Sequence, residues 1–104
     1  MDWKSKGNKR LIQAILALET KNQAKRFLRD LMTKKEIDEF AKRLKAAEML
    51  TKKIPYSIIA QETGLSSTTI ARVAKWLKGP GGGYRIIISK LHHHGSIQSR
   101  RGLS

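Results

Sequence analysis

Between positions 66 and 75, closely spaced residues have side chains suited to contact nucleic acid. They are Ser66, Ser67, Thr68, Ala71, Arg72 and Lys75. Small hydroxyl groups at the start of a helix can bond phosphates or base edges, and basic groups attract the phosphate backbone. Only Arg72 among them is a strong outward-pointing base reader. Sequence preference would therefore depend on duplex shape, on bridging water or on methyl contacts.

The stretch that contains these residues has the pattern of two short helices joined by a sharp turn. Ala60 is small, as the close approach of two helices requires, and Gly64 can adopt the positive φ of the turn. Ser66 is a good N-cap for the second helix. Ile70 then begins the apolar side that packs on the first helix. The spacing predicts a helix-turn-helix at 56–77, whose second helix enters a groove of the duplex.

The first helix of such a pair crosses the phosphate backbone, so its first residues are candidates for phosphate contact. These are Tyr56 and Ser57, which follow Pro55, a residue suited to a first helical turn. A purely structural alternative is also open, in which Ser66 only caps the helix and Thr69 only packs. Capping is the firmer role for Ser66, and base contact is the weaker one.

The net charge favours a polyanionic partner. The 104 residues carry a formal charge of +14, and Glu62 is the only acidic residue after Glu48. Such a balance is typical of proteins that bind DNA or RNA, and less often of those that bind an acidic membrane. A solvated basic surface, or association with ribosomes, would give the same composition.

Several classes of function are excluded or disfavoured. The chain has no cysteine, so disulfides and thiolate metal sites are excluded. No segment approaches the roughly 18 apolar residues of a membrane span, and no signal peptide is recognisable, which predicts a bacterial-type cytoplasmic protein without membrane contact. No nucleophile and base are paired, so we expect no catalysis and no cofactor.

Two other segments are weak candidates for binding. His92, His93 and His94 are consecutive and cannot share one helix face, so no metal site is predicted there. The glycines after Pro80 lack the ending of a phosphate-binding loop and are expected to form a hinge. Trp3 and Trp76 are expected to pack rather than to stack on single strands.

The remaining chain is predicted to be helical up to the glycines. Residues 1–8 resemble a flexible basic leader, and 9–29 have a wide apolar row at helical spacing. Thr33 and Glu36 form a capping box that starts the next helix, which runs to about Thr51. The helical domain is thus expected over 9–78.

Beyond it, 79–91 are expected to form a Gly-rich hinge and a short closing element, and 92–104 a basic disordered tail. The closing element is rich in β-branched residues and could be a strand or a short helix.

The order of these motifs resembles the Trp repressor superfamily, most of all its YerC/YecD (TrpR-like) branch. The shared marks are Leu31-Met32-Thr33, Glu36, Arg43-Leu44, the run from Thr68 to Val73, and Gly82-Gly83-Tyr84. The resemblance covers about residues 28 to 91. It implies an all-α, intertwined homodimer that binds a palindromic operator in double-stranded DNA.

The resemblance also implies where an amino-acid corepressor would bind. The positions that match the ligand pocket of tryptophan-sensing members are Thr33, Arg43, Thr69 and Arg72. This chain departs from that pattern, with Val73 in place of a glycine and Trp76 in place of a small polar residue. Both changes are expected to fill the space of the ligand, so tryptophan is not expected to bind, and no other corepressor is assigned.

Together these features predict a sequence-specific DNA-binding transcriptional regulator, a repressor that acts as a homodimer. Two alternatives stay open. One is an RNA- or ribosome-associated basic protein, and the other is a helical module whose wide apolar row binds another protein.

Overall fold

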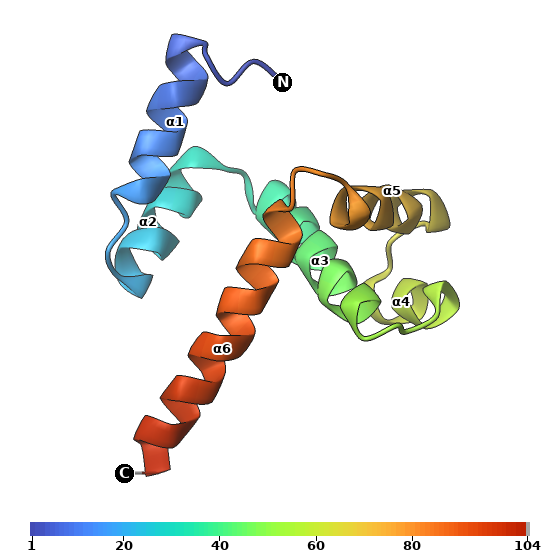
Figure 1. The fold of residues 1–104 in the computed structure, drawn as a ribbon. Helices are drawn as coiled ribbons and strands as arrows, with labels where there is room; N and C mark the ends of the chain where they lie inside the picture. The colour runs from blue at the N-terminus through green and yellow to red at the C-terminus, as the bar shows by residue number, and fades with distance from the viewer. Residues whose placement is uncertain (104) are drawn as a thin grey trace. The chain divides into compact units, whose positions relative to one another are not determined.

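The computed structural model describes the backbone of residues 1–103 and the side chains of residues 1–93. Every regular element in that backbone is an α-helix, which confirms the all-α fold class (Figure 1). The helices are α1 (Lys6–Leu16), α2 (Lys21–Leu31), α3 (Lys34–Thr51), α4 (Tyr56–Thr63), α5 (Ser67–Lys78) and α6 (Gly83–Leu103). The chain has two compact units, Met1–Ile37 and Asp38–Ser104.

Two helices, α1 and α2, form where the sequence predicted one helix over 9–29. The Thr20 hydroxyl accepts from the Gln23 amide at 3.1 Å and caps α2. The Gln23 side chain in turn accepts from the Glu19 amide at 2.9 Å. A threonine three residues before a glutamine is a helix-start signal, and the continuous apolar row had concealed it.

The N-terminal leader is also shorter than the predicted 1–8. Ser5 caps α1 by accepting from the Asn8 amide at 3.2 Å, so the helix begins at Lys6. The basic residues at the start of the chain therefore lie partly on a helix.

The apolar row of α1 is not buried within this chain. Its four largest members, Leu11, Ile12, Ile15 and Leu16, are between 39% and 79% exposed, and neither α1 nor α2 has a buried residue. Isolated helices of this length are marginal in water, because most helix stability in proteins comes from packing an apolar face. The first unit therefore has an apolar surface that its own residues do not bury.

The predicted capping box at the start of α3 is confirmed. The Thr33 hydroxyl accepts from the Glu36 amide at 3.1 Å, and the Glu36 carboxylate accepts from the Thr33 amide and hydroxyl, each at 3.0 Å. The bond from the Thr33 amide, followed by that from its hydroxyl, lowers the pKa of Glu36. This end of α3 is fixed by local bonds alone.

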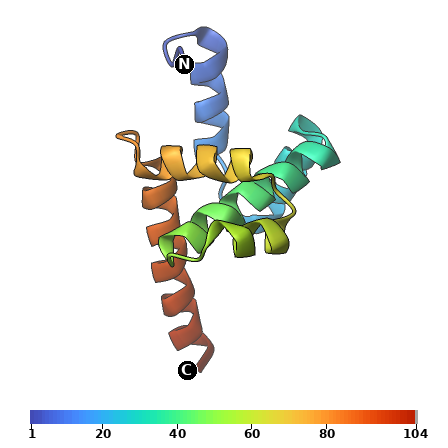
Figure 2. The same ribbon diagram turned by 90° about the vertical axis from the view of Figure 1, so that its right-hand side faces the viewer.

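The core lies in the second unit, where α3, α4 and α5 meet. Ala46 and Ala47 of α3 are fully buried, and their small side chains let the other helices approach. Ile59 of α4 and Ile70 of α5 are the largest fully buried side chains. Buried side chains from all three helices form one core cluster, which holds the α4–α5 pair against α3 (Figures 1 and 2).

The last element, α6, differs from the prediction for 79–91 and 92–104. Gly82 has a φ of 70°, ends the glycine-rich turn, and is followed by the helix. Tyr84 and Ile88, four residues apart, pack on the core, and this contact favours helix over the strand that the β-branched residues allowed. The helical backbone continues through Leu103, where a disordered tail was expected. The side chains from residue 94 onward and all of residue 104 lie outside the described part.

Candidate nucleic-acid interface

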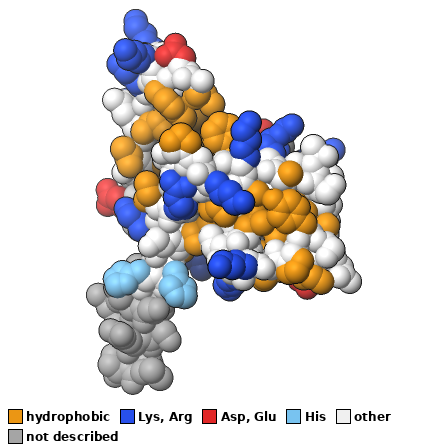
Figure 3. All heavy atoms as spheres, turned by 45° about the vertical axis from the view of Figure 1, so that its right-hand side comes forward, with side chains coloured by type: hydrophobic (Ala, Val, Ile, Leu, Met, Phe, Trp, Pro, Cys, Tyr) orange, Lys and Arg blue, Asp and Glu red, His pale blue; other side chains and the backbone are white. Residues whose placement is uncertain are grey.

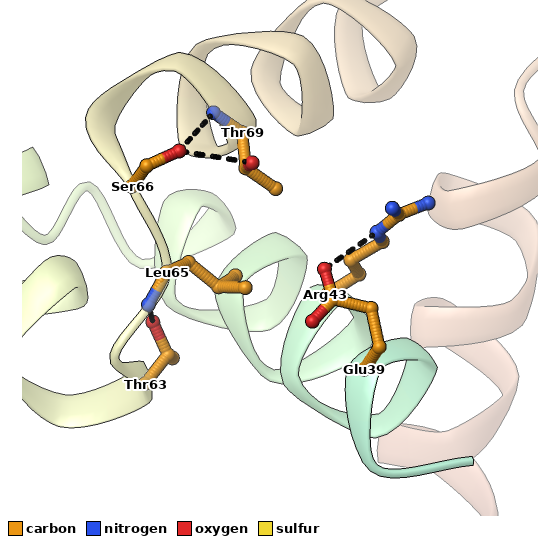
Figure 4. A network of polar contacts seen from close by, with 6 residues as sticks. All are labelled: Glu39, Arg43, Thr63, Leu65, Ser66 and Thr69. Carbon is orange, nitrogen blue, oxygen red and sulfur yellow. Dashed lines mark hydrogen bonds and ion pairs between the residues drawn. The ribbon is translucent and has the colours of Figure 1, made fainter. Parts of the chain in front are cut away.

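The turn between α4 and α5 is held by backbone conformation and by one buried hydroxyl. Gly64 has a φ of 76°, a conformation that side chains with a Cβ rarely adopt. The Thr63 hydroxyl donates to the Ile59 carbonyl at 2.7 Å. It also accepts from the Leu65 amide at 3.2 Å (Figure 4). The Leu65 side chain is buried in the core. The turn thus fixes the direction in which α5 leaves α4.

Ser66 is the N-cap of α5, as predicted. Its hydroxyl oxygen accepts from the Thr69 amide at 3.1 Å, and the hydroxyl donates to the Thr69 hydroxyl at 3.0 Å (Figure 4). Both polar groups of this pair therefore have partners within the protein. The next residues, Ser67 and Thr68, lie on the first turn of α5 and are exposed.

The two sides of α5 differ sharply in exposure. Ile70, Val73, Ala74 and Leu77 are buried against the core. Each residue that the sequence predicted to contact DNA is exposed: Tyr56, Ser57, Ser66, Ser67, Thr68, Ala71, Arg72 and Lys75. Helical periodicity places the last four of these on the side of α5 away from the core. We refer to this set of eight residues as the candidate reading face.

The candidate reading face has two basic residues, Arg72 and Lys75, and no acidic one. Within the described residues, no carboxylate pairs with Arg72 or Lys75. The acid of the α4–α5 pair, Glu62, lies 3.9 Å from the Lys45 ammonium in a largely exposed ion pair. On the helix pair, Figure 3 shows basic side chains beside hydrophobic ones and few acidic ones. A phosphate backbone would meet little repulsion there.

A shallow apolar hollow of about 490 Å³ opens on the flank of α5. It is lined by Leu44, Trp76, Gly81, Gly82, Gly83, Tyr84 and Ile87. Trp76, at the edge of the hollow, is 65% exposed. The sequence predicted that its indole would fill a slot within the chain, and it does not. Trp3 is likewise 58% exposed, and neither tryptophan has the packing role expected of it.

Three of the four candidate ligand residues, all except Arg72, have a local partner. Arg43 Nε lies 3.5 Å from the Glu39 carboxylate, one helical turn earlier, and its guanidinium lies 5.6 Å from the centre of the Phe40 ring. Thr69 bonds to Ser66, and Thr33 bonds to Glu36. In Figure 4, Arg43 on α3 forms an ion pair with Glu39, and Thr69 on α5 is hydrogen-bonded to Ser66.

The chain is similar in sequence and in structure to known proteins of one family. Residues 6–92 match the sequence pattern of the family described as Trp repressor protein. The chain belongs to the Trp repressor family. The predicted resemblance is therefore confirmed, and its extent is larger than the residues 28 to 91 from which it was inferred.

Relatives within the Trp repressor family support the same assignment. The chain is 36% identical over 81 residues to the uncharacterized protein YerC of Bacillus subtilis. The aligned residues cover 78% of each protein. A TrpR-like protein from Eubacterium eligens has a TM-score of 0.81 and 34% identity, over 86% of this chain and 93% of that one. A candidate Trp repressor from Staphylococcus aureus has a TM-score of 0.81 and 32% identity, over 88% and 95%.

One contact on this Trp repressor fold was missed by the sequence analysis. Arg85, on the first turns of α6, donates from Nη1 to the carbonyl of Leu77 and, at 2.9 Å, to that of Gly79. The nearest signal in the sequence is a basic residue shortly after a glycine-rich turn. That signal could not show that the side chain returns to the end of α5.

The described residues contain neither a metal-binding cluster nor a membrane-spanning helix. No group of three or more carboxylate, histidine or cysteine side chains there could hold a metal ion. His92 and His93 are exposed on α6, and the side chain of His94 lies outside the described part. No described helix is both long and apolar enough to cross a membrane.

Proposed function

We propose that this protein is a sequence-specific DNA-binding transcriptional regulator, a repressor in which α4 and α5 act as a helix-turn-helix. The observation that carries the proposal is the reading face. Its hydroxyl and basic side chains are exposed on one side of a helix whose other side is locked in the core. A rigid helix with an uncompensated basic surface suits the major groove of duplex DNA.

The residues of the reading face would contact different parts of the DNA according to their position. Tyr56 and Ser57, at the start of α4, would contact phosphates. Ser67, Thr68 and Ala71 would approach base edges or thymine methyl groups, while Ser66 mainly caps α5. Arg72 would make the strongest base contact and Lys75 a phosphate contact.

We infer that the protein acts as a homodimer on a palindromic site, in the bacterial cytoplasm. The apolar row of α1 supports this inference, because its largest side chains are uncovered within one chain. A second copy would bury the row and would present a second reading face. Two-fold symmetry of the protein would then be matched by two-fold symmetry of the operator.

We further propose that DNA binding does not require tryptophan. Val73 is buried in the core, at the position where tryptophan-sensing members have a glycine. Arg43, which would bind the ligand carboxylate in those members, is already paired with Glu39. A free amino acid would meet the negative charge of the Glu39 carboxylate beside Arg43.

Selection of binding sites from a random duplex library tests the proposed function. We expect a palindromic sequence to be enriched equally with and without tryptophan. The log of the binding constant for that duplex should fall with the log of salt concentration by about 0.9 per phosphate contacted. Enrichment of no sequence, with equal retention of all duplexes, would contradict the proposal.

A competition with RNA separates the proposal from its main alternative. An RNA- or ribosome-associated protein would release the selected duplex when structured RNA is added at equal nucleotide concentration. A regulator of transcription would retain the duplex. If the protein is a monomer that binds a different protein through its apolar row, the second alternative, a helical protein-interaction module, would be supported instead.

A further inference from the structure

The end of α5 is linked to α6 by the Arg85 side chain, in addition to the packing of Tyr84 and Ile88 on the core. Its guanidinium donates to the carbonyls of Leu77 and Gly79, where the helix has no partners of its own for these groups. A cation at this end also complements the partial negative charge of the helix. Arg85 therefore stabilises the C-terminal end of α5 by hydrogen bonds and by charge.

The loop between α5 and α6 cannot provide this anchorage alone, because glycines and Pro80 make up residues 79–83. Gly82 has a φ of 70°, and a Cβ built on it would lie 3.2 Å from Arg85 Nη2. Glycine at this position thus allows both the turn and the approach of the guanidinium. The absence of a side chain at Gly82 therefore leaves room for the Arg85 contact.

The anchored end of α5 is close to the proposed DNA contacts. The helix has 12 residues, about 18 Å, and Lys75 and Arg72 precede Leu77 by two and five positions. Ser66 and the turn at Gly64 hold the opposite end. Because the other side of α5 is packed in the core, loss of the Arg85 bonds would loosen the last turn rather than the whole helix, and would displace the basic side chains nearest to that turn.

We propose that Arg85 is a positioning residue, which holds the last turn of α5 and its basic side chains in the position needed to read bases without contacting DNA itself. This inference rests on the proposed function. It distinguishes Arg85 from the other basic residues, whose contribution would be direct attraction of phosphates.

The test compares Arg85→Ala with Lys90→Ala, which removes the same charge from an exposed position of α6. For Arg85→Ala we expect about a tenfold loss of preference for the selected duplex over a scrambled one, because charge-assisted hydrogen bonds are lost. Affinity for the scrambled duplex and the salt dependence should not change. Lys90→Ala should keep the full preference, and Arg85→Lys should lie between Arg85→Ala and the unaltered protein.

Two results would overturn the inference. One is an unchanged preference in Arg85→Ala. The other is a salt dependence that falls by about 0.9, which would mean that Arg85 contacts a phosphate directly. A purely structural role would lower the melting temperature and leave the preference intact.

Amide hydrogen exchange separates failure of this inference from failure of the proposed function. The Gly79 amide donates to the Trp76 carbonyl at 3.2 Å in the last turn of α5. Its exchange should be faster in Arg85→Ala and unchanged in Lys90→Ala, whether or not DNA binds. If the unaltered protein prefers no duplex, the proposed function fails, and equal exchange in both variants would refute the positioning role as well.

Discussion

Arg72 is the residue of the reading face with the greatest capacity to recognise a base, because its planar guanidinium can donate two parallel hydrogen bonds. It is exposed on α5, and no described carboxylate competes for it. We expect Arg72→Ala to weaken binding of the selected duplex by about 1–3 kcal/mol and to relax preference at one base position. Fluorescence anisotropy at fixed salt would measure both effects.

The matched control for that prediction is Arg26→Ala. Arg26 is exposed on α2 and outside the reading face, so its loss changes the net charge equally. We expect this variant to alter affinity for all duplexes slightly and alike. Equal behaviour of the two variants would remove Arg72 from the proposed site.

Glu36 makes the stability of the capping box depend on pH. Its folded-state pKa lies below the ordinary 4.5, chiefly because the Thr33 amide donates to the carboxylate. A depressed pKa contributes stability above the unfolded-state value, and this contribution is lost as the pH falls through the folded-state value. Glu36→Gln should thus lower the melting temperature at pH 7, and the deficit should shrink in strong acid.

Thermal unfolding followed by circular dichroism would check this pH dependence. Glu19→Gln is the control, since Glu19 lies in the same unit and its side chain makes no described hydrogen bond. A deficit of Glu36→Gln that stayed constant from neutral to acid pH would contradict the assigned role of the carboxylate.

At the scale of elements, the connection from α3 to α4 contains a residue in an unfavourable conformation. Lys53 has a φ of 60°, and it follows α3 where helices commonly end in glycine. The Lys53 amide donates to the Leu50 carbonyl and the Ile54 amide to the Met49 carbonyl, at 3.0 and 3.2 Å. These bonds keep the chain in the left-handed region despite the Cβ.

Lys53→Gly should therefore raise the free energy of unfolding by about 1 kcal/mol. Urea denaturation would measure the change. Lys52→Gly is the control, because Lys52 does not have a positive φ, and glycine there should give no gain. A gain of the same size in both variants would contradict the account of strain at Lys53.

Local signals made several elements predictable from sequence. The capping boxes and the turn depend on residues three or four apart, so Thr33, Glu36, Gly64 and Ser66 have the roles that their spacing indicated. The start of α2 carried a similar signal at Thr20. It was overlooked because the apolar row runs through the break.

Other features depend on contacts between distant residues and could not be predicted locally. The helix at Tyr84 and Ile88 depends on packing against a core formed by earlier helices. The Arg85 contact depends on the path of the glycine-rich turn. Trp76 was expected from the family resemblance to fill the space of a ligand, but its indole is largely exposed, and the sequence alone does not show what lies over a side chain.

At the scale of the whole molecule, the uncovered apolar row of α1 leads to a prediction about assembly. In sedimentation equilibrium we expect a particle of twice the chain mass of 11.8 kDa. Ile15→Lys, in the row, should shift the mass toward that of one chain, because a charge would be buried in the contact. Gln13→Lys, at an exposed polar position of α1, should leave the dimer intact.

A monomer that keeps its fold at micromolar concentration would contradict this prediction. It would also remove the symmetry argument for a palindromic operator. The reading face could still bind DNA, but only as a single helix pair on a half-site.

The central claim is that the α4–α5 pair reads duplex DNA by sequence. The most direct measurement is the ratio of affinities for the selected palindrome and for a scrambled duplex of the same composition, at physiological salt and without amino acids. The account predicts a preference of about a thousandfold or more, as specific DNA-binding proteins show. Equal affinity for the two duplexes, or a preference that appears only with added tryptophan, would contradict it.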